Sequence, residues 1–126
     1  MEEKKVLLVE DEATNRQYVK IVLTNLNYDV QIAEDGPTAI SQSKEGFFDA
    51  ILMDINLGKN MNGIQAMKEI RKADRYKKVP IIAVTANAMQ GHKEEFLAEG
   101  FDHYLSKPFN MTQLSKLIHD VLVDGE

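Results

Sequence analysis

The chain has 126 residues, which predicts one domain over residues 1–126 and excludes two domains of ordinary size. Apolar residues make up 44% of the chain and charged residues 28%, a balance that excludes an intrinsically disordered or collagen-like protein. The absence of cysteine excludes disulfides and thiolate metal sites and is typical of a cytoplasmic protein, while the net charge of −5 gives no general attraction to nucleic acid.

Four short aliphatic runs predict strands at residues 6–9, 30–33, 50–53 and 81–84, and a weaker fifth strand is predicted at 103–106. Three of these runs are continuously apolar, as strands of a parallel sheet are when helices cover both faces. The run at 30–33 alternates between apolar and polar residues, which predicts an edge strand. No apolar run approaches the roughly 20 residues that a membrane span needs, so we expect no membrane partner.

Apolar residues with helical spacing lie between these strands and predict helices. The clearest sets are Val19, Val22, Leu23 and Leu26; Ile64, Met67 and Ile70; and Leu114, Leu117, Ile118 and Val121. Gly36-Pro37 is a typical helix start, and Asn110 with Gln113 three residues later resembles a capping box. Strand and helix alternate five times, which predicts an α/β fold: a doubly wound parallel sheet of five strands, covered by five helices in three layers.

Polar residues follow the predicted strands, at the points where a parallel sheet would bring them to one edge. They are Glu10, Asp11 and Glu12 after the first strand, Asp54 after the third, Thr85 after the fourth, and Ser106 and Lys107 at the end of the fifth. Carboxylates packed together suppress one another's ionisation unless a cation compensates them. Their oxygen donors favour a hard divalent ion, Mg²⁺ or Mn²⁺, over zinc or copper.

These residue types predict a metal site beside a phosphoryl acceptor. Asp11 and Asp54 would supply carboxylates to the metal, Glu10 would bind it through water, and Asn56 would contribute its backbone carbonyl. The ammonium group of Lys107 and the hydroxyl group of Thr85 would bind oxygens of the phosphoryl group. The arrangement predicts phosphoryl transfer to the carboxylate of Asp54.

Four segments, 9–12, 52–54, 84–86 and 104–109, resemble a known family, the receiver domains of two-component response regulators. They resemble, in this order, the acidic doublet, the phosphoacceptor strand, the threonine-alanine step and the closing lysine-proline motif of that family. The resemblance covers essentially the whole chain and implies a flavodoxin-like fold with strand order 2-1-3-4-5. Residues 85–91 are most similar to the receivers of hybrid histidine kinases.

The resemblance implies a role for each site residue. Asp54 would accept a phosphoryl group from the phosphohistidine of a histidine kinase or a histidine phosphotransfer protein. Glu10 and Asp11 would position Mg²⁺, while Thr85, Ala86 and Lys107 would bind the phosphoryl group. Tyr104 would be an aromatic switch that follows Thr85, and the Lys107–Pro108 peptide bond is implied to be cis.

The same resemblance implies a regulated binding module in a phosphorelay, and not an enzyme with an independent substrate. Its output surface would be the fourth helix, fifth strand and fifth helix, including Ala88, Met89 and Tyr104. An unidentified downstream protein would read this surface, because we expect no output domain in the chain. The protein would act as a monomer or as a dimer that forms on phosphorylation.

One segment departs from the family pattern. Gly58 stands where the family usually has a proline, and Gly63 follows Asp54 by nine residues instead of eight. We therefore predict that the loop 56–62 is one residue longer and more mobile than usual, with the carbonyl of Asn56 still in place.

Other functions stay open from the residues alone. A Mg²⁺-dependent aspartyl-phosphate phosphatase would use the same nucleophile, but Asn56 stands where its second aspartate would be. A flavodoxin-like FMN carrier would need a phosphate loop where the acids after the first strand repel anions. A receiver-like domain that no longer accepts phosphate is the third alternative. The cations between Lys68 and Lys78 are compatible with nucleic acid, although cations near a helix C-terminus need no ligand.

Overall fold

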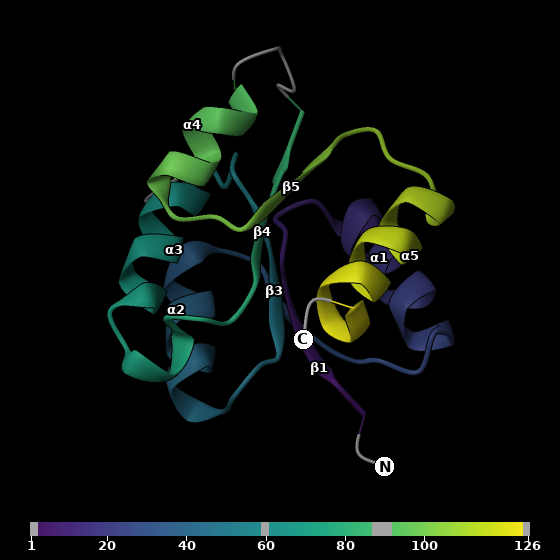
Figure 1. The fold of residues 1–126 in the computed structure, drawn as a ribbon, viewed down its shortest axis with the longest axis horizontal. Helices are drawn as coiled ribbons and strands as arrows, with labels where there is room; N and C mark the ends of the chain where they lie inside the picture. The colour runs from purple at the N-terminus through teal and green to yellow at the C-terminus, as the bar shows by residue number, and fades with distance from the viewer. Residues whose placement is uncertain (1–2, 59–60, 87–91, 125–126) are drawn as a thin grey trace.

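The computed structural model describes residues 3–58, 61–86 and 92–124. Its strands are β1 (Lys5–Val9), β2 (Asp29–Ala33), β3 (Ala50–Asp54), β4 (Ile81–Thr85) and β5 (His103–Ser106). They form one parallel sheet in the order β2-β1-β3-β4-β5 (Figure 1). The predicted fold class and strand order are therefore confirmed, and the alternating run at 30–33 is an edge strand as expected.

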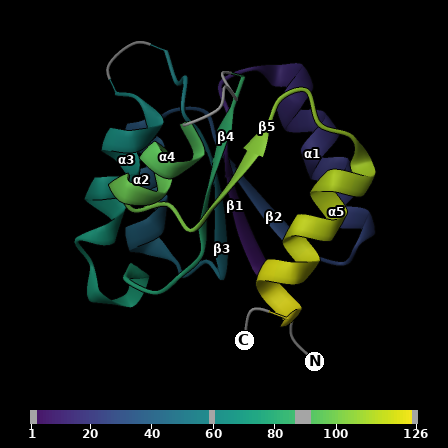
Figure 2. The ribbon, with the colours of Figure 1, turned by 45° about the horizontal axis from the view of Figure 1, so that its top comes forward.

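Helices cover both faces of the sheet. They are α1 (Ala13–Asn25), α2 (Gly36–Glu45), α3 (Gly63–Arg71), α4 (His92–Glu99) and α5 (Met111–His119), with a 3₁₀ turn η1 (Asp74–Tyr76) and a π-helical turn η2 (Asp120–Asp124). Figure 2 shows α1 and α5 on one face and α2, α3 and α4 on the other. The fold thus has three layers, with the sheet in the middle.

Two apolar layers form the core, one on each face of the sheet. Successive strand residues alternate between them: Leu7 and Ile51 pack in the layer beneath α2, α3 and α4, whereas Leu8 and Leu52 pack in the layer beneath α1 and α5. All four side chains are buried. This two-sided burial explains why β1, β3 and β4 are continuously apolar in the sequence.

Among the helix starts that the structure describes, side chains cap those of α2, α3 and α5. At the start of α5, the Asn110 carboxamide oxygen accepts from the Gln113 amide at 2.8 Å, and Gln113 returns the contact to the Asn110 amide at 2.9 Å, which confirms the predicted capping box. Asn62 and Gln65 make the same reciprocal contacts at the start of α3. Asp35 caps α2 by accepting from the Thr38 amide at 2.8 Å.

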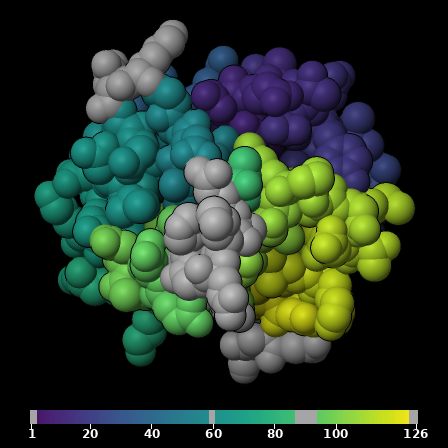
Figure 3. All heavy atoms as spheres, turned by 90° about the horizontal axis from the view of Figure 1, so that it is seen from above, coloured from purple at the N-terminus to yellow at the C-terminus, as the bar shows by residue number. Residues whose placement is uncertain are grey.

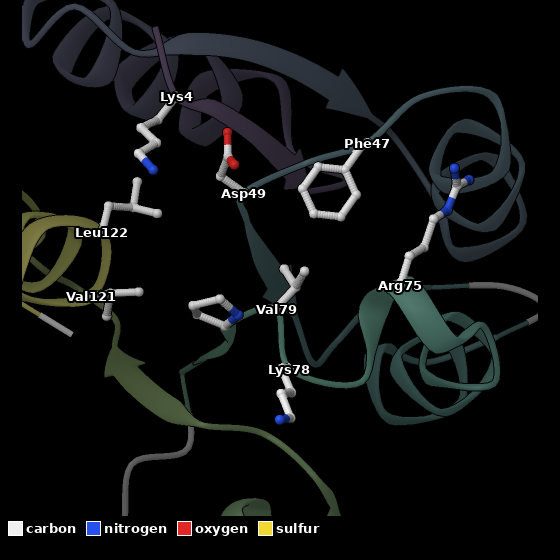
Figure 4. Close-up of a pocket in the computed structure, with 9 residues that line it drawn as sticks. Lys4, Phe47, Asp49, Arg75, Lys78, Val79, Val121 and Leu122 are labelled. Atoms are coloured by element: carbon white, nitrogen blue, oxygen red, sulfur yellow. The ribbon is translucent and has the colours of Figure 1, made fainter. Parts of the chain in front are cut away.

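The end of the sheet where β1, β3 and β4 begin carries a pocket of about 370 Å³ (Figure 4). Phe47 lines it and stacks on the buried Tyr76 ring, with the two centroids 5.5 Å apart. The Tyr76 hydroxyl donates to the Gly46 carbonyl at 2.9 Å, which ties η1 to the end of α2. Phe47 and Tyr76 thus pack at the amino end of the strands, opposite the carboxyl end where the site is predicted.

Arg71 joins α3 to the segments that precede β4 and β5. Its guanidinium group, in a side chain that is 16% exposed, donates to the carbonyls of Tyr76, Val79 and Gly100 and to the Asp102 carboxylate, at 2.6 to 3.0 Å. Asp102 also accepts from the Ile81 amide at 2.9 Å. One cation therefore satisfies three backbone acceptors in two segments that are separate in sequence.

We expect Arg71→Met to lower the free energy of unfolding by about 2–3 kcal/mol, because three half-buried carbonyls lose their donor. The Asp102 contact adds little, since solvent screens that exposed carboxylate. Urea unfolding measures the change. Lys72→Met is the control, because Lys72 is the next residue, is exposed and pairs with the neighbouring Glu69 side chain on the surface. Equal stability of the two variants would contradict the role of Arg71.

Tyr76 predicts a pH dependence at alkaline pH. Burial raises the pKa of Tyr76 above its ordinary value of 10.0, against smaller lowering effects of a backbone contact with Phe48 and of Arg75. Because the neutral phenol is favoured in the fold, its contribution to stability is complete below pH about 10 and is lost as pH rises through the raised pKa. We expect the free energy of unfolding of wild type, measured with urea, to exceed that of Tyr76→Phe at pH 8. This difference in free energy should narrow above pH 10. A difference that stays constant to pH 11 would argue against this assignment.

Candidate functional site

The carboxyl ends of the strands bring three acids together. Asp54 is the last residue of β3, and Glu10 follows β1 directly after the Val9–Met53 register pair. One carboxylate oxygen from each of Glu10, Asp11 and Asp54 lies within 4.8 Å of the others. Figure 3 looks onto this edge, which the purple start of α1, the teal start of α3 and the yellow-green segment before α5 border.

Asp54 is held by contacts on both of its carboxylate oxygens. Its side chain is 3% exposed. Oδ1 accepts from the Asn56 amide at 2.9 Å, and Oδ2 accepts from the Lys107 ammonium at 3.1 Å. The carboxylate is thus fixed in orientation at the edge where ligands of open α/β sheets bind.

Lys107 bridges the two buried acids. Its Nζ lies 3.0 Å from Glu10 Oε1 and 3.1 Å from Asp54 Oδ2. Its own backbone is positioned by β4, because the Lys107 amide donates to the Thr85 carbonyl at 2.8 Å. The following Lys107–Pro108 peptide bond is cis.

Burial perturbs the charges of this cluster. The pKa of Glu10 is raised from 4.5 to about 7, first by burial and then by the hydrogen bond and charge of Asp54, against the lowering effect of Lys107. Burial lowers the pKa of Lys107, but the contacts and negative charges of Glu10 and Asp54 outweigh it, so the pKa lies above 10.5. Lys107 therefore stays charged at neutral pH.

The cluster fits a hard divalent cation. Its three acids, when ionised, and one ammonium group carry two excess negative charges, which a divalent ion balances. Every donor is an oxygen, as Mg²⁺ prefers. Asp11, the exposed member, accepts from the Gly58 amide at 3.4 Å, and Asn56 is exposed at the same edge. Asp11 is therefore open to solvent, while Glu10 and Asp54 form a buried floor.

The remaining predicted residues lie on β4 and β5. Thr85 ends β4 and is 1% exposed, and it is in register with Ser106 of β5. Ala86 follows it and is exposed. Tyr104 is half-buried, with its ring centroid 6.5 Å from that of Phe96 on α4. Ala88 and Met89, which we predicted on the output surface, lie outside the described residues.

The loop after Asp54 packs against the domain where it is described. Leu57 is buried, and Met61 packs on the apolar layer beneath α2 and α3. Met61 Sδ lies 2.8 Å from the point where a Cβ would stand on Gly36, the first residue of α2. Residues 59 and 60, on which the prediction of greater mobility depends, lie outside the described part.

Two contributions were missed at the sequence level. Arg16 on α1 donates to the Glu10 carbonyl at 3.2 Å, a contact for which the sequence carries no periodic signal. The basic stretch between Lys68 and Lys78 was weighed as a nucleic-acid contact and as cations near a helix end. In the structure, Arg71 makes the contacts described above, Lys68 pairs with Glu99, and Arg75 donates to the Ser43 carbonyl.

Comparisons with known proteins agree with this geometry. Residues 6–119 match the family model described as "Response regulator receiver domain". The chain is 40% identical over 126 residues to "Hybrid signal transduction histidine kinase I" of Dictyostelium discoideum, covering 94% of this chain and 7% of that protein. It is 34% identical over 118 residues to "Chemotaxis protein CheY-3" of Vibrio cholerae, covering 93% and 90% respectively.

A solved structure extends the comparison to the metal. The receiver domain of sensor histidine kinase PA1611 from Pseudomonas aeruginosa PAO1 matches with a TM-score of 0.87 and 37% identity, over 96% of this chain and 98% of that one. It is described with a magnesium ion coordinated in its active site cleft. Within the residues that the structure describes here, no helix is long and apolar enough to cross a membrane.

We expect Asp11→Asn to weaken Mg²⁺ binding by about tenfold or more, because a charged oxygen donor is lost from a site with few protein ligands. Titration of the metal-free protein, followed by backbone amide chemical shifts, measures the dissociation constant. Glu12→Gln removes a neighbouring charge that lies outside the three-acid cluster and serves as the control. Equal weakening in both variants would mean that general charge, and not a ligand at Asp11, attracts the metal.

Proposed function

Because the chain belongs to the response regulator receiver family, we propose that it is a signalling switch that accepts a phosphoryl group on Asp54. The observation that supports this proposal best is the position of the Asp54 carboxylate. It lies buried between the Lys107 ammonium and the acids Glu10 and Asp11, at the edge of the sheet where a ligand can reach it. A carboxylate held in this way is an oriented nucleophile whose charge is offset in part by Lys107.

The proposed reaction is a displacement at phosphorus. An oxygen of Asp54 attacks the phosphorus atom of a phosphohistidine, the P–O bond forms as the N–P bond breaks, and the departing imidazole takes a proton from solvent. Lys107 moves its contact from the carboxylate to a phosphoryl oxygen, while the Thr85 hydroxyl and the Ala86 amide donate to the others. A bound Mg²⁺ or Mn²⁺, held by Asp11, Asp54, the Asn56 carbonyl and, through water, Glu10, would supply further charge neutralisation.

A groove of about 440 Å³ beside Lys107 offers an approach for the donor. Its lining includes Ala86, Lys107 and Pro108 from the site side and Tyr18 and Phe109 from α1 and the segment before α5. Tyr18 is 40% exposed, and its ring centroid lies 6.4 Å from that of Phe109. We place the donor here because an apolar surface next to the nucleophile suits a protein partner.

Tyr104 would transmit phosphorylation of Asp54 to the output surface. In the register of β4 and β5, Tyr104 lies two residues before Ser106, the partner of Thr85. Its half-buried ring packs near Phe96, so a change of rotamer alters the packing of α4 against β5. Phosphorylation would bias these two arrangements and thereby change partner binding at the surface formed by α4, β5 and α5.

The partners follow from the same chemistry. The donor would be a histidine kinase or a histidine phosphotransfer protein, and a separate downstream protein would read the output surface, with this protein a monomer or a phosphorylation-dependent dimer. The chain spans 7% of the length of the Dictyostelium kinase and 12% of that of BarA of Escherichia coli, so such a receiver also occurs as one part of a longer protein. We place it in the cytoplasm, where phosphodonors and Mg²⁺ are available.

We expect wild type to gain the mass of one phosphoryl group when it is incubated with a small phosphodonor and Mg²⁺, and Asp54→Asn to gain none. Intact-mass spectrometry measures this. Asp29→Asn, an exposed acid at the other end of the sheet, should behave as wild type. A gain of one phosphoryl group by Asp54→Asn would show that another residue is the acceptor. Sustained Asp54-dependent turnover of a generic phosphate ester would favour the phosphatase.

A further inference from the structure

The Glu10 peptide lies just beyond the part of β1 that is in register with β3. That register ends at Val9 and Met53. The Glu10 amide donates to the Ala33 carbonyl of β2 at 3.1 Å, and the Glu10 carbonyl accepts from Arg16 Nη1 at 3.2 Å. The Arg16 side chain of α1 thus holds the backbone at Glu10, the first of the two consecutive acids Glu10 and Asp11.

Arg16 is well placed for this contact. Its side chain is 18% exposed, and Nη2 lies 3.8 Å from the Glu34 carboxylate at the end of β2. Glu34 is 74% exposed, so solvent screens that pair and it contributes little. The hydrogen bond to the Glu10 carbonyl is therefore the contact that matters.

The carbonyl of Glu10 and the amide of Asp11 belong to one rigid peptide plane. A rotation of this plane would swing the Asp11 side chain relative to Asp54, and these two acids offer oxygens within 4.8 Å of each other. Glu10 itself is held from its side chain, since Oε2 accepts from the Glu12 amide at 3.2 Å and Oε1 contacts Lys107. Arg16 supplies the backbone restraint for the exposed acid.

We propose that Arg16 is a positioning residue for the metal: by holding the Glu10–Asp11 peptide plane, it keeps Asp11 in place to bind Mg²⁺ together with Asp54. This inference rests on the proposed function, because it concerns the same metal. Groups that orient metal ligands in this way commonly affect metal affinity by 10-fold to 100-fold.

A simple charge effect would give the opposite result. Arg16 is a cation near three acids, so its removal would strengthen the attraction of the cluster for Mg²⁺ if only charge mattered. Loss of positioning would weaken binding despite the more negative surroundings. The direction of the change therefore separates the two explanations.

The experiment compares Arg16→Met with wild type by Mg²⁺ titration, followed by backbone amide shifts. We expect the dissociation constant to rise about tenfold. In the metal-free protein, we also expect the amide resonance of Asp11 to shift, because that N–H shares its peptide group with the Glu10 carbonyl. Lys20→Met is the control: it removes the same charge one helical turn further along α1, from an exposed position, and should bind Mg²⁺ within about twofold of wild type.

Equal or tighter Mg²⁺ binding by Arg16→Met would overturn the inference, as would an equal loss in Lys20→Met. If Arg16→Met does not fold, Arg16→Gln is titrated instead, with the same expected direction and the same contrary outcomes. A wild type that binds no Mg²⁺ would count against the proposed function. A wild type that binds Mg²⁺ as tightly as Arg16→Met would count against the role of Arg16 alone.

Discussion

The contact of the Lys107 ammonium group with Glu10 and Asp54 is the interaction on which the arrangement of the site depends. Two carboxylates that are almost fully buried repel each other, and the Lys107 contact opposes the rise in the pKa of Glu10 that burial and this repulsion cause. Lys107 comes from 53 residues beyond Asp54, and the pairing of β5 with β4 brings it there. The pairing of β5 with β4 therefore also delivers the ammonium group that contacts the nucleophile.

The two ends of the sheet have different physical tasks. At the amino end, Arg71 and Tyr76 donate to half-buried carbonyls and thereby hold the connections before β4 and β5. At the carboxyl end, acids are brought together at an electrostatic cost that the packing elsewhere must support. The contacts that stabilise the connections and the acids of the candidate site thus lie at opposite ends of the strands. The repulsion between the acids therefore does not act on the contacts of Arg71 and Tyr76.

The sequence was informative where a physical requirement repeats locally. Burial on both faces makes β3 and β4 continuously apolar, and the capping geometry of α5 needs Asn110 and Gln113 at fixed spacing, so these elements were predictable. The acids Asp11 and Asp54 were predictable because parallel strands end at a common edge. Arg16 was not, because a side chain that donates to a backbone carbonyl leaves no periodic pattern. The same holds for Arg71, whose partner Asp102 is 31 residues away.

The contact between Met61 and Gly36 has a consequence for sequence variation. The thioether occupies the space in which a side chain on Gly36 would lie, so the loop that carries Met61 and the start of α2 share one volume. An alanine at 36 would require a shorter or displaced side chain at 61, and its Cβ would also lie 3.3 Å from the Cβ of Ala66. During divergence, we expect residues 36 and 61 to change together, so a substitution in the loop would be accompanied by one at the start of α2.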